Sequence, residues 1–254
     1  MLFKRRRRKK LADGPFPSEW LAILEGKVPL YAGLSEPDRA ELRRHMLVFL
    51  AEKRFEGCAG LEITDEMRVV IAAHACLLLL HRKTDYYPGL KTILVYPDAF
   101  VVPDVHHHIG DMVLESDDVR LGESWPDGSV VLSWNDMVDD AGARDGQNLA
   151  LHEFAHQLDS SGGRGDSTPV LRDQASFDAW ARALGEDYDR FRRAVRRRRP
   201  EVLDEYGATD PAEFFAVATE SFFENPGGLR GGYPRLYDEL RKFYQQDPAS
   251  WGPA

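Results

Sequence analysis

Residues 149–159, with the sequence LALHEFAHQLD, are the stretch from which the fold and the chemistry of this chain can be worked out. The stretch places His152 and His156 four residues apart among apolar neighbours. On an α-helix, two residues at this spacing lie one above the other on the same face. Two imidazoles arranged in this way can hold one Zn²⁺ ion at about 2.0–2.1 Å per bond. Glu153 would project beside such an ion, where it can accept a proton from an attacking water.

A helix of the protein core offers the alternative interpretation, in which both histidines only form hydrogen bonds. Leu151, Phe154 and Leu158 fit a half-buried helix, and either Asn148 or Asp145 can cap its start. Burying two imidazoles and a carboxylate together costs free energy unless a partner satisfies them. We therefore favour the zinc interpretation.

The composition is that of an ordinary globular protein. Of the 254 residues, 43% are hydrophobic and 30% are charged, and the length allows one large domain or two small ones. The net charge is −9, and the segment Lys4–Lys10 (KRRRRKK) holds seven positive charges, so removing that segment leaves −16 for the rest. An acidic body argues against a broad nucleic-acid surface, and no direct nucleic-acid partner is expected.

Cysteine content and hydropathy indicate the compartment. Two cysteines, Cys58 and Cys76, do not form a disulfide framework, which favours a reducing compartment and a cytoplasmic location. No run reaches the roughly 18 apolar residues of a membrane span. The basic start continues as LADGP rather than as an apolar segment, so it does not resemble a secretory signal.

The spacing of apolar residues, together with the helix caps and the Gly and Pro residues that interrupt it, predicts an α+β, mainly helical protein with a small mixed sheet. Residues 1–15 are predicted to form a disordered basic arm, which we interpret as a solvated tail. The less favoured alternative is an anchor to an anionic membrane surface or to nucleic acid. Residues 16–88 form an N-terminal helical region, with helix starts at Ser35 and Thr64. Residues 89–254 form the catalytic region, packed with the first as one domain.

Four strands are expected in the second region, at residues 91–96, 100–102, 119–124 and 129–134. The last of them precedes the histidine-bearing helix and is interpreted as an extended edge that can pair with a substrate backbone. The run His106–His108 is predicted to lie in a polar surface loop. A second metal site there is the alternative, which lacks a carboxylate or cysteine at clear ligand spacing.

A catalytic zinc ion usually has three protein ligands, so a third ligand is needed. Asp210 and Pro211 make a good helix start, and Glu213 falls at its third position, where it could instead close a capping box. Glu220 follows seven residues later on the same face. The chemistry favours Glu213 as the third ligand and leaves Glu220 and Asp159 as alternatives.

These residues resemble those of the Mlc titration factor A family of bacterial zinc peptidases. The resemblance is carried by HEFAHQLD at residues 152–159 and by Tyr206 with TDPAE at residues 209–213, and it extends from about residue 15 towards the C-terminus. It implies a zincin-like fold related to the catalytic domain of anthrax lethal factor and a gluzincin site with one zinc ion. The arginine-rich arm, His106–His108 and the cluster Arg196–Arg199 are not part of the pattern.

The resemblance also assigns roles. It implies that His152, His156 and Glu213 bind zinc, that Glu153 is the catalytic base and that Tyr206 stabilises the transition state. Asp159 and Glu220 are then expected to orient the ligand histidines. The implied activity is that of an aminopeptidase-like enzyme acting on short peptides. The alternative is a regulatory protein that sequesters a transcriptional repressor, with peptidase activity secondary.

Overall fold

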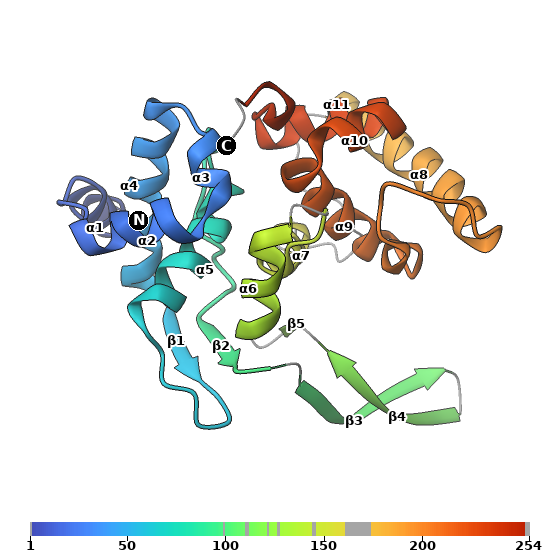
Figure 1. Cartoon of the computed structure of the whole chain (residues 1–254), viewed down its shortest axis with the longest axis horizontal. Coiled ribbons are helices and arrows are strands. Elements are labelled where there is room, and N and C mark those ends of the chain that lie inside the picture. Colours follow the sequence, from blue (N-terminus) through green and yellow to red (C-terminus); the bar gives the residue numbers. More distant parts are fainter. Residues whose placement is uncertain are drawn as a thin grey trace.

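Helices make up most of this computed structural model, which describes residues 2–98, 100–109, 112–120, 122–125, 128–143, 146–160 and 174–251 (Figure 1). The helices are α1 (Leu2–Ala12), α2 (Ser18–Lys27), α3 (Pro29–Gly33), α4 (Glu36–Glu52), α5 (Asp65–Leu77), α6 (Trp134–Ala143), α7 (Leu149–Ser160), α8 (Gln174–Arg196), α9 (Pro211–Glu224), α10 (Pro226–Gly232) and α11 (Pro234–Tyr244), with short 3₁₀ helices η1 (Glu205–Ala208) and η2 (Pro248–Ser250). The strands are β1 (Arg54–Gly57), β2 (Thr92–Tyr96), β3 (Phe100–Ile109), β4 (Met112–Arg120), β5 (Gly122–Trp125) and β6 (Ser129–Ser133).

The N-terminal helices begin where the capping residues predict. The Ser35 hydroxyl accepts the Asp38 N–H at 3.3 Å at the start of α4, and the Thr64 hydroxyl accepts the Met67 N–H at 3.2 Å at the start of α5. Each hydroxyl satisfies a backbone donor that has no partner within its own helix. Both predicted helix starts are therefore confirmed.

The main sheet is small and mixed, as predicted, with the strand order β1-β2-β6-β5. Strands β1, β2 and β6 are parallel, and β5 runs antiparallel to β6. The buried residues Ile93 and Val95 of β2 stand opposite the buried residues Val130 and Leu132 of β6. The prediction that β6 forms an edge is wrong, because β2 and β5 pair with its two sides. Within the described strands, β5 occupies that end of the sheet.

Strands β3 and β4 form a separate antiparallel hairpin. His106–His108 lie in β3 rather than in the loop that the sequence predicts, opposite residues 113–115 of β4. Their side chains lie outside the described part of the structure, so the alternative of a second metal site there stays a prediction.

Helix α7 lies in the middle of the molecule (Figure 1). It packs against α5, α6, α9 and strands β5 and β6. Its fully buried Phe154 ring is 5.8 Å from the ring of Phe49 in α4 and 5.2 Å from that of Tyr87, measured between centroids. Aromatic pairs at these separations stabilise a core beyond the burial of their area. The core thus holds α7 through Phe154, on the face of the helix away from the two histidines.

The basic segment 1–15 was predicted to be disordered, and that prediction is wrong because residues 2–12 form α1. Arg8 makes two hydrogen bonds to the Glu52 carboxylate at the end of α4, at 2.9 and 2.7 Å, and a further one to Asp85. Lys4 also pairs with Asp85, at 3.1 Å. These acids lie 44 and 77 residues from Arg8 in the sequence, so the pairing could not be predicted from the charges near Arg8 alone.

The two regions expected on either side of residue 88 share one sheet. Strand β1 belongs to the first region and pairs with β2 of the second, with Phe55 opposite Ile93. Near the other end of the chain, the Trp251 ring lies 6.0 Å from that of Phe223 in α9. None of the described helices combines the length and the apolar character that crossing a bilayer requires. The division into two regions stays a prediction.

Acidification is expected to release α1 from the body. The hydrogen bonds from Arg8 hold the pKa of Glu52 below its ordinary value of 4.5. A carboxyl group with a lowered pKa stabilises the folded arrangement at pH values above its unfolded pKa, and this contribution is lost as pH falls through the folded pKa. Hydrogen-exchange protection factors of residues 2–12 should therefore fall as pH is lowered from about 7 to about 3, while those of α7 persist.

The variant Glu52→Gln serves as the control, since it removes the titrating group but keeps the side-chain shape. Protection of α1 in this variant should already be low at neutral pH. Protection that stayed high at acidic pH in the unaltered chain would contradict the role given to the Arg8–Glu52 pair.

Candidate metal centre

Helix α7 is buried along almost its whole length, and its two histidines are the side chains that emerge from it. Asn148 caps the helix by accepting the Leu151 N–H at 3.1 Å, which settles the choice that the sequence left between Asn148 and Asp145. From Leu149 to Asp159 every residue is buried except His152 and His156, which are half-buried. Their spacing brings both ring Nε2 atoms to the same place, 3.1 Å apart.

Helix α9 brings Glu213 to these two rings. Asp210 caps α9 by accepting the N–H groups of Ala212 and Glu213 at 2.7 and 3.0 Å, and Pro211 occupies the first turn. The cap places Glu213 in that turn with its Oε2 atom 2.9 Å from Nε2 of His152 and 3.4 Å from Nε2 of His156. Glu213 was the favoured candidate for the third ligand, and it is the acid that contacts the two ring Nε2 atoms.

The three ligand atoms fit a small divalent cation. They all lie within 4.8 Å of one another. Tetrahedral zinc with bonds of about 2.0–2.1 Å separates its ligand atoms by about 3.3 Å, close to the observed 2.9, 3.1 and 3.4 Å. Two imidazole nitrogens and a carboxylate oxygen are also ligands that suit zinc.

The electrostatics of the cluster likewise call for a cation. Burial favours the neutral imidazole of His152, yet hydrogen bonds to Glu213 and Glu220 raise its pKa well above the ordinary value. Burial alone would raise the pKa of Glu213, but the two histidines lower it to about 2. A metal ion satisfies the same demand as the proton and competes with it for the ring nitrogen.

Glu220 lies behind His152. One of its carboxylate oxygens is 2.7 Å from Nδ1 of His152, and the other accepts the backbone N–H of Asn148 at 2.6 Å. With Nδ1–H donating to Glu220, the lone pair on Nε2 faces Glu213 and His156, which is the tautomer that a metal requires. The geometry thus separates the two acids, with Glu213 on the ligand side of the ring and Glu220 on its far side.

Asp159 is buried near the end of α7 and does not belong to the group of His152, His156 and Glu213 among the described residues. Its expected role beside a ligand histidine therefore stays a prediction.

Glu153 follows His152 in α7 and is buried. Only 4% of its surface is exposed, and in the described part of the chain its Oε2 atom has no hydrogen-bond partner. Burial raises the pKa of Glu153 to about 7, against the opposing effect of His152 and His156. A carboxyl group with such a pKa can both accept and return a proton near neutral pH.

Tyr206 stands across from His152, with 6.1 Å between the ring centroids. It lies in η1, and its side chain is 56% exposed, although it is large and partly apolar. Asp204 accepts the Tyr206 N–H at 2.8 Å and the Gln147 amide at 2.8 Å. The segment that precedes Tyr206 is therefore tied to the segment that precedes α7.

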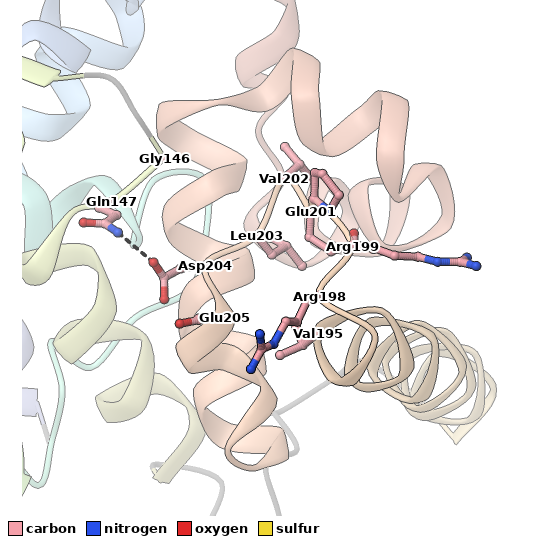
Figure 2. A pocket seen from close by; sticks show the side chains of 11 residues that line it. Gly146, Gln147, Val195, Arg198, Arg199, Glu201, Val202, Leu203, Asp204 and Glu205 are labelled. Carbon is pink, nitrogen blue, oxygen red and sulfur yellow. Dashed lines mark hydrogen bonds between the residues drawn. The ribbon is translucent and has the colours of Figure 1, made fainter.

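A cavity of about 670 Å³ lies next to the hydrogen bond between Gln147 and Asp204. It is bounded by the end of α8, by Gly146 and Gln147, and by residues 200–205 (Figure 2). Arg198, whose φ of 51° lies in the left-handed region, extends across the cavity, and Arg199 points away from it (Figure 2). The arginines in the last turn of α8 also complement the helix dipole, as cations at a helix C-terminus do. Only the folding of residues 200–205 back towards Gln147 reveals that Arg198 lines a cavity.

A second group of possible ligands consists of Asp38, Glu41 and His81. Both ring nitrogens of His81 already face carboxylates, with Nε2 3.1 Å from Asp38 and Nδ1 3.4 Å from Glu41. The backbone N–H of His81 also donates to Glu41 at 2.9 Å. These contacts join the segment after α5 to α4, which gives His81 a structural role.

Comparison with known proteins covers nearly the whole chain. Residues 2–245 match the model of the family described as glucose-regulated metallo-peptidase M90. The chain is 42% identical over 244 residues to the uncharacterized protein slr2042 of Synechocystis sp., a match covering 95% of this chain and 89% of that protein. It is 35% identical over 228 residues to Mlc titration factor A of Klebsiella pneumoniae (87% and 84%) and 33% identical over 236 residues to that of Yersinia pestis (91% and 85%).

Replacing Glu220 by Gln is expected to weaken zinc binding by about 10- to 100-fold, since the hydrogen bond that orients His152 loses its charge. Zinc affinity can be measured by competition with a chromophoric chelator. The matched control is Glu224→Gln, which removes the same charge one turn further along α9, where Glu224 accepts from the Asn148 side chain at 2.7 Å. Equal affinities for the two variants would contradict the role of Glu220.

Proposed function

We propose, from the premise that this chain belongs to the glucose-regulated metallo-peptidase family M90, that it is a zinc-dependent peptidase of the gluzincin type. The observation that carries the proposal is the meeting of His152, His156 and Glu213 around one point, with buried Glu153 beside them. A structural zinc site is usually closed by four protein ligands and needs no acid in that position. The packing of helix α7 against strands β5 and β6 of a small mixed sheet supports a zincin-like fold.

In the proposed reaction, His152, His156 and Glu213 would hold a zinc ion. Bound there, the ion would supply Lewis acidity, which activates water near neutral pH and polarises a carbonyl group. Glu153 accepts a proton from the attacking water and later gives it to the leaving amine. Its burial, which raises its pKa above the ordinary value, supports the uptake of that proton.

Tyr206 is proposed to donate a hydrogen bond to the oxygen that becomes negative as water adds to the carbonyl. Its exposure and its place across from His152 support this role. A donor that is already in position stabilises the developing charge without reorganisation at the moment of reaction. Glu220 acts through His152, whose ring orientation it holds.

The proposed substrates are short peptides or exposed chain ends, and the aminopeptidase-like preference rests on the family resemblance. The cavity that Asp204 and Glu205, the two residues before Tyr206, help to line is a candidate site for side chains of the substrate. We also propose a cytoplasmic location, supported by Cys58 and Cys76, which are both free thiols.

A second candidate function is the binding and sequestration of a transcriptional repressor. The family resemblance implies such sequestration, and two relatives that are 35% and 33% identical to this chain bear the name Mlc titration factor A. Peptidase activity would then be secondary. A pull-down with the Glu153→Gln variant separates the candidates, because repressor binding without cleavage would favour regulation.

The variant Glu153→Gln should bind zinc like the unaltered chain but lose about 10²- to 10⁴-fold in turnover, since the amide cannot accept the proton. Activity is measured on a small panel of aminoacyl reporter substrates, with metal content determined on the same samples. Chelation should abolish the activity of the unaltered chain, and added zinc should restore it. Full activity in Glu153→Gln would refute the assignment of the base.

The variant Tyr206→Phe should lower turnover by about 10²- to 10³-fold with metal content and KM unchanged, because it removes one donor to the transition state. Folding should be preserved, since the side chain is more than half exposed. The control Tyr31→Phe removes a hydroxyl that contacts Arg43 in the N-terminal helices and should not change turnover. An unaltered rate in Tyr206→Phe would remove Tyr206 from the mechanism.

A further inference from the structure

Helix α1 has a composition that does not favour a helix on its own. It holds seven cations in succession, so Lys4 and Arg8, Arg5 and Lys9, and Arg6 and Lys10 are like charges at i,i+4 spacing. Such pairs destabilise a helix, and no acid in the first turn offsets the positive N-terminal end of the helix dipole. Contacts with the body must therefore hold α1 in place.

Those contacts use one face of the helix. Arg8 bonds to Glu52 and Asp85 and lies over the Tyr86 ring, 4.7 Å from its centroid. Leu11 and Ala12 pack against the core on the same side. Since only Lys4 and Arg8 of the seven cations are paired with acids in the described part of the chain, the repulsion among the other five is not offset.

The opposite side, called here the outer face of α1, consists of Phe3, Arg6, Arg7 and Lys10. These positions follow the i, i+3, i+4, i+7 spacing of one helix face. All four side chains are exposed, and Phe3 is 87% exposed, the largest value among the exposed large hydrophobic residues of the described part. Arg5 and Lys9 flank this face and are exposed as well.

The position of α1 limits what can bind it. It lies at the left edge of the molecule in Figure 1, away from α8. The charge of the remaining chain is −16, so an anionic partner is attracted at α1 and repelled by most of the body. A helix at an edge can rest on a flat surface. An aromatic ring among cations suits the boundary between lipid headgroups and acyl chains.

We propose that the outer face of α1 binds the surface of a bilayer that contains anionic phospholipids. Arg6, Arg7 and Lys10 contact the headgroups, and Phe3 enters the boundary below them. Because Arg8 fixes α1 to α4, the helix would carry the whole molecule to the surface rather than act as a loose tether. This binding does not depend on the proposed peptidase activity.

The test is co-sedimentation of the full chain with phosphatidylcholine vesicles, with or without about 30 mol% phosphatidylglycerol. Binding is expected only to the anionic vesicles and should weaken as NaCl is raised from about 0.1 M to about 0.5 M. Equal binding to both kinds of vesicle, or binding to neither, would overturn the proposal.

A triple variant, Arg6→Gln with Arg7→Gln and Lys10→Gln, should lower the partition coefficient by about 100-fold, from about fivefold for each cation. Glutamine favours helices, and its introduction relieves repulsion, so α1 should remain formed. The matched control removes the same charge at the end of α8, by Arg193→Gln with Arg196→Gln and Arg197→Gln. Its partitioning should stay within about twofold of the unaltered chain, because loss from a distant site changes only the weak long-range field.

Phe3→Ala should weaken binding by about tenfold while keeping its salt dependence, because it removes apolar contact and no charge. Equal losses in the triple variant and its α8 control would show a non-specific charge effect and overturn the proposal. So would binding of a fluorescent duplex DNA that is tighter than binding to the anionic vesicles under the same salt conditions.

Discussion

The Glu220 carboxylate is the contact on which the arrangement of the site depends. It is buried in α9, and its two oxygens accept from the N–H at the start of α7 and meet Nδ1 of His152. One side chain thereby sets both where the two helices meet and which nitrogen of the ring faces Glu213. Removing a charged group from such a buried position costs far more than the same change at the surface, because its partners are left unsatisfied.

The core holds the other face of the same helix. Phe154, one residue after Glu153, packs with Phe49 and Tyr87, while His152 and His156 turn towards α9 and η1. A close-packed interior allows little movement of the backbone that carries these side chains. Rigid support of this kind matters for a metal centre, whose ligand atoms must stay within a few tenths of an ångström of their positions.

Much of the local structure could be predicted from the sequence because its causes are local. The caps at Ser35, Thr64 and Asp210 act on residues two or three positions away, and the spacing of His152 and His156 places both on one helical face. The position of Glu213 was harder, since spacing alone also allowed Glu220 and Asp159. Only the packing of α9 on α7 separates the two acids of α9 into opposite sides of one imidazole.

The errors arose where distant residues decide the outcome. The charge block at the N-terminus was interpreted as disordered, because the acid that pairs with Arg8 at the end of α4 is remote in the sequence. Strand β6 was taken for an edge, although β2 and β5 pair with both of its sides. The cavity that Arg198 lines depends on how residues 200–205 fold back towards Gln147, which no periodicity encodes.

The pairing of β1 with β2 has a consequence for any attempt to isolate the half of the chain that carries the site. A fragment starting at residue 89 would keep β2 but lose β1, whose residues 54–57 pair with residues 92–95. The bare side of β2 would then present unpaired N–H and C=O groups next to apolar residues. Such an edge invites association with the same edge of another molecule, so the shortened protein would be prone to aggregate.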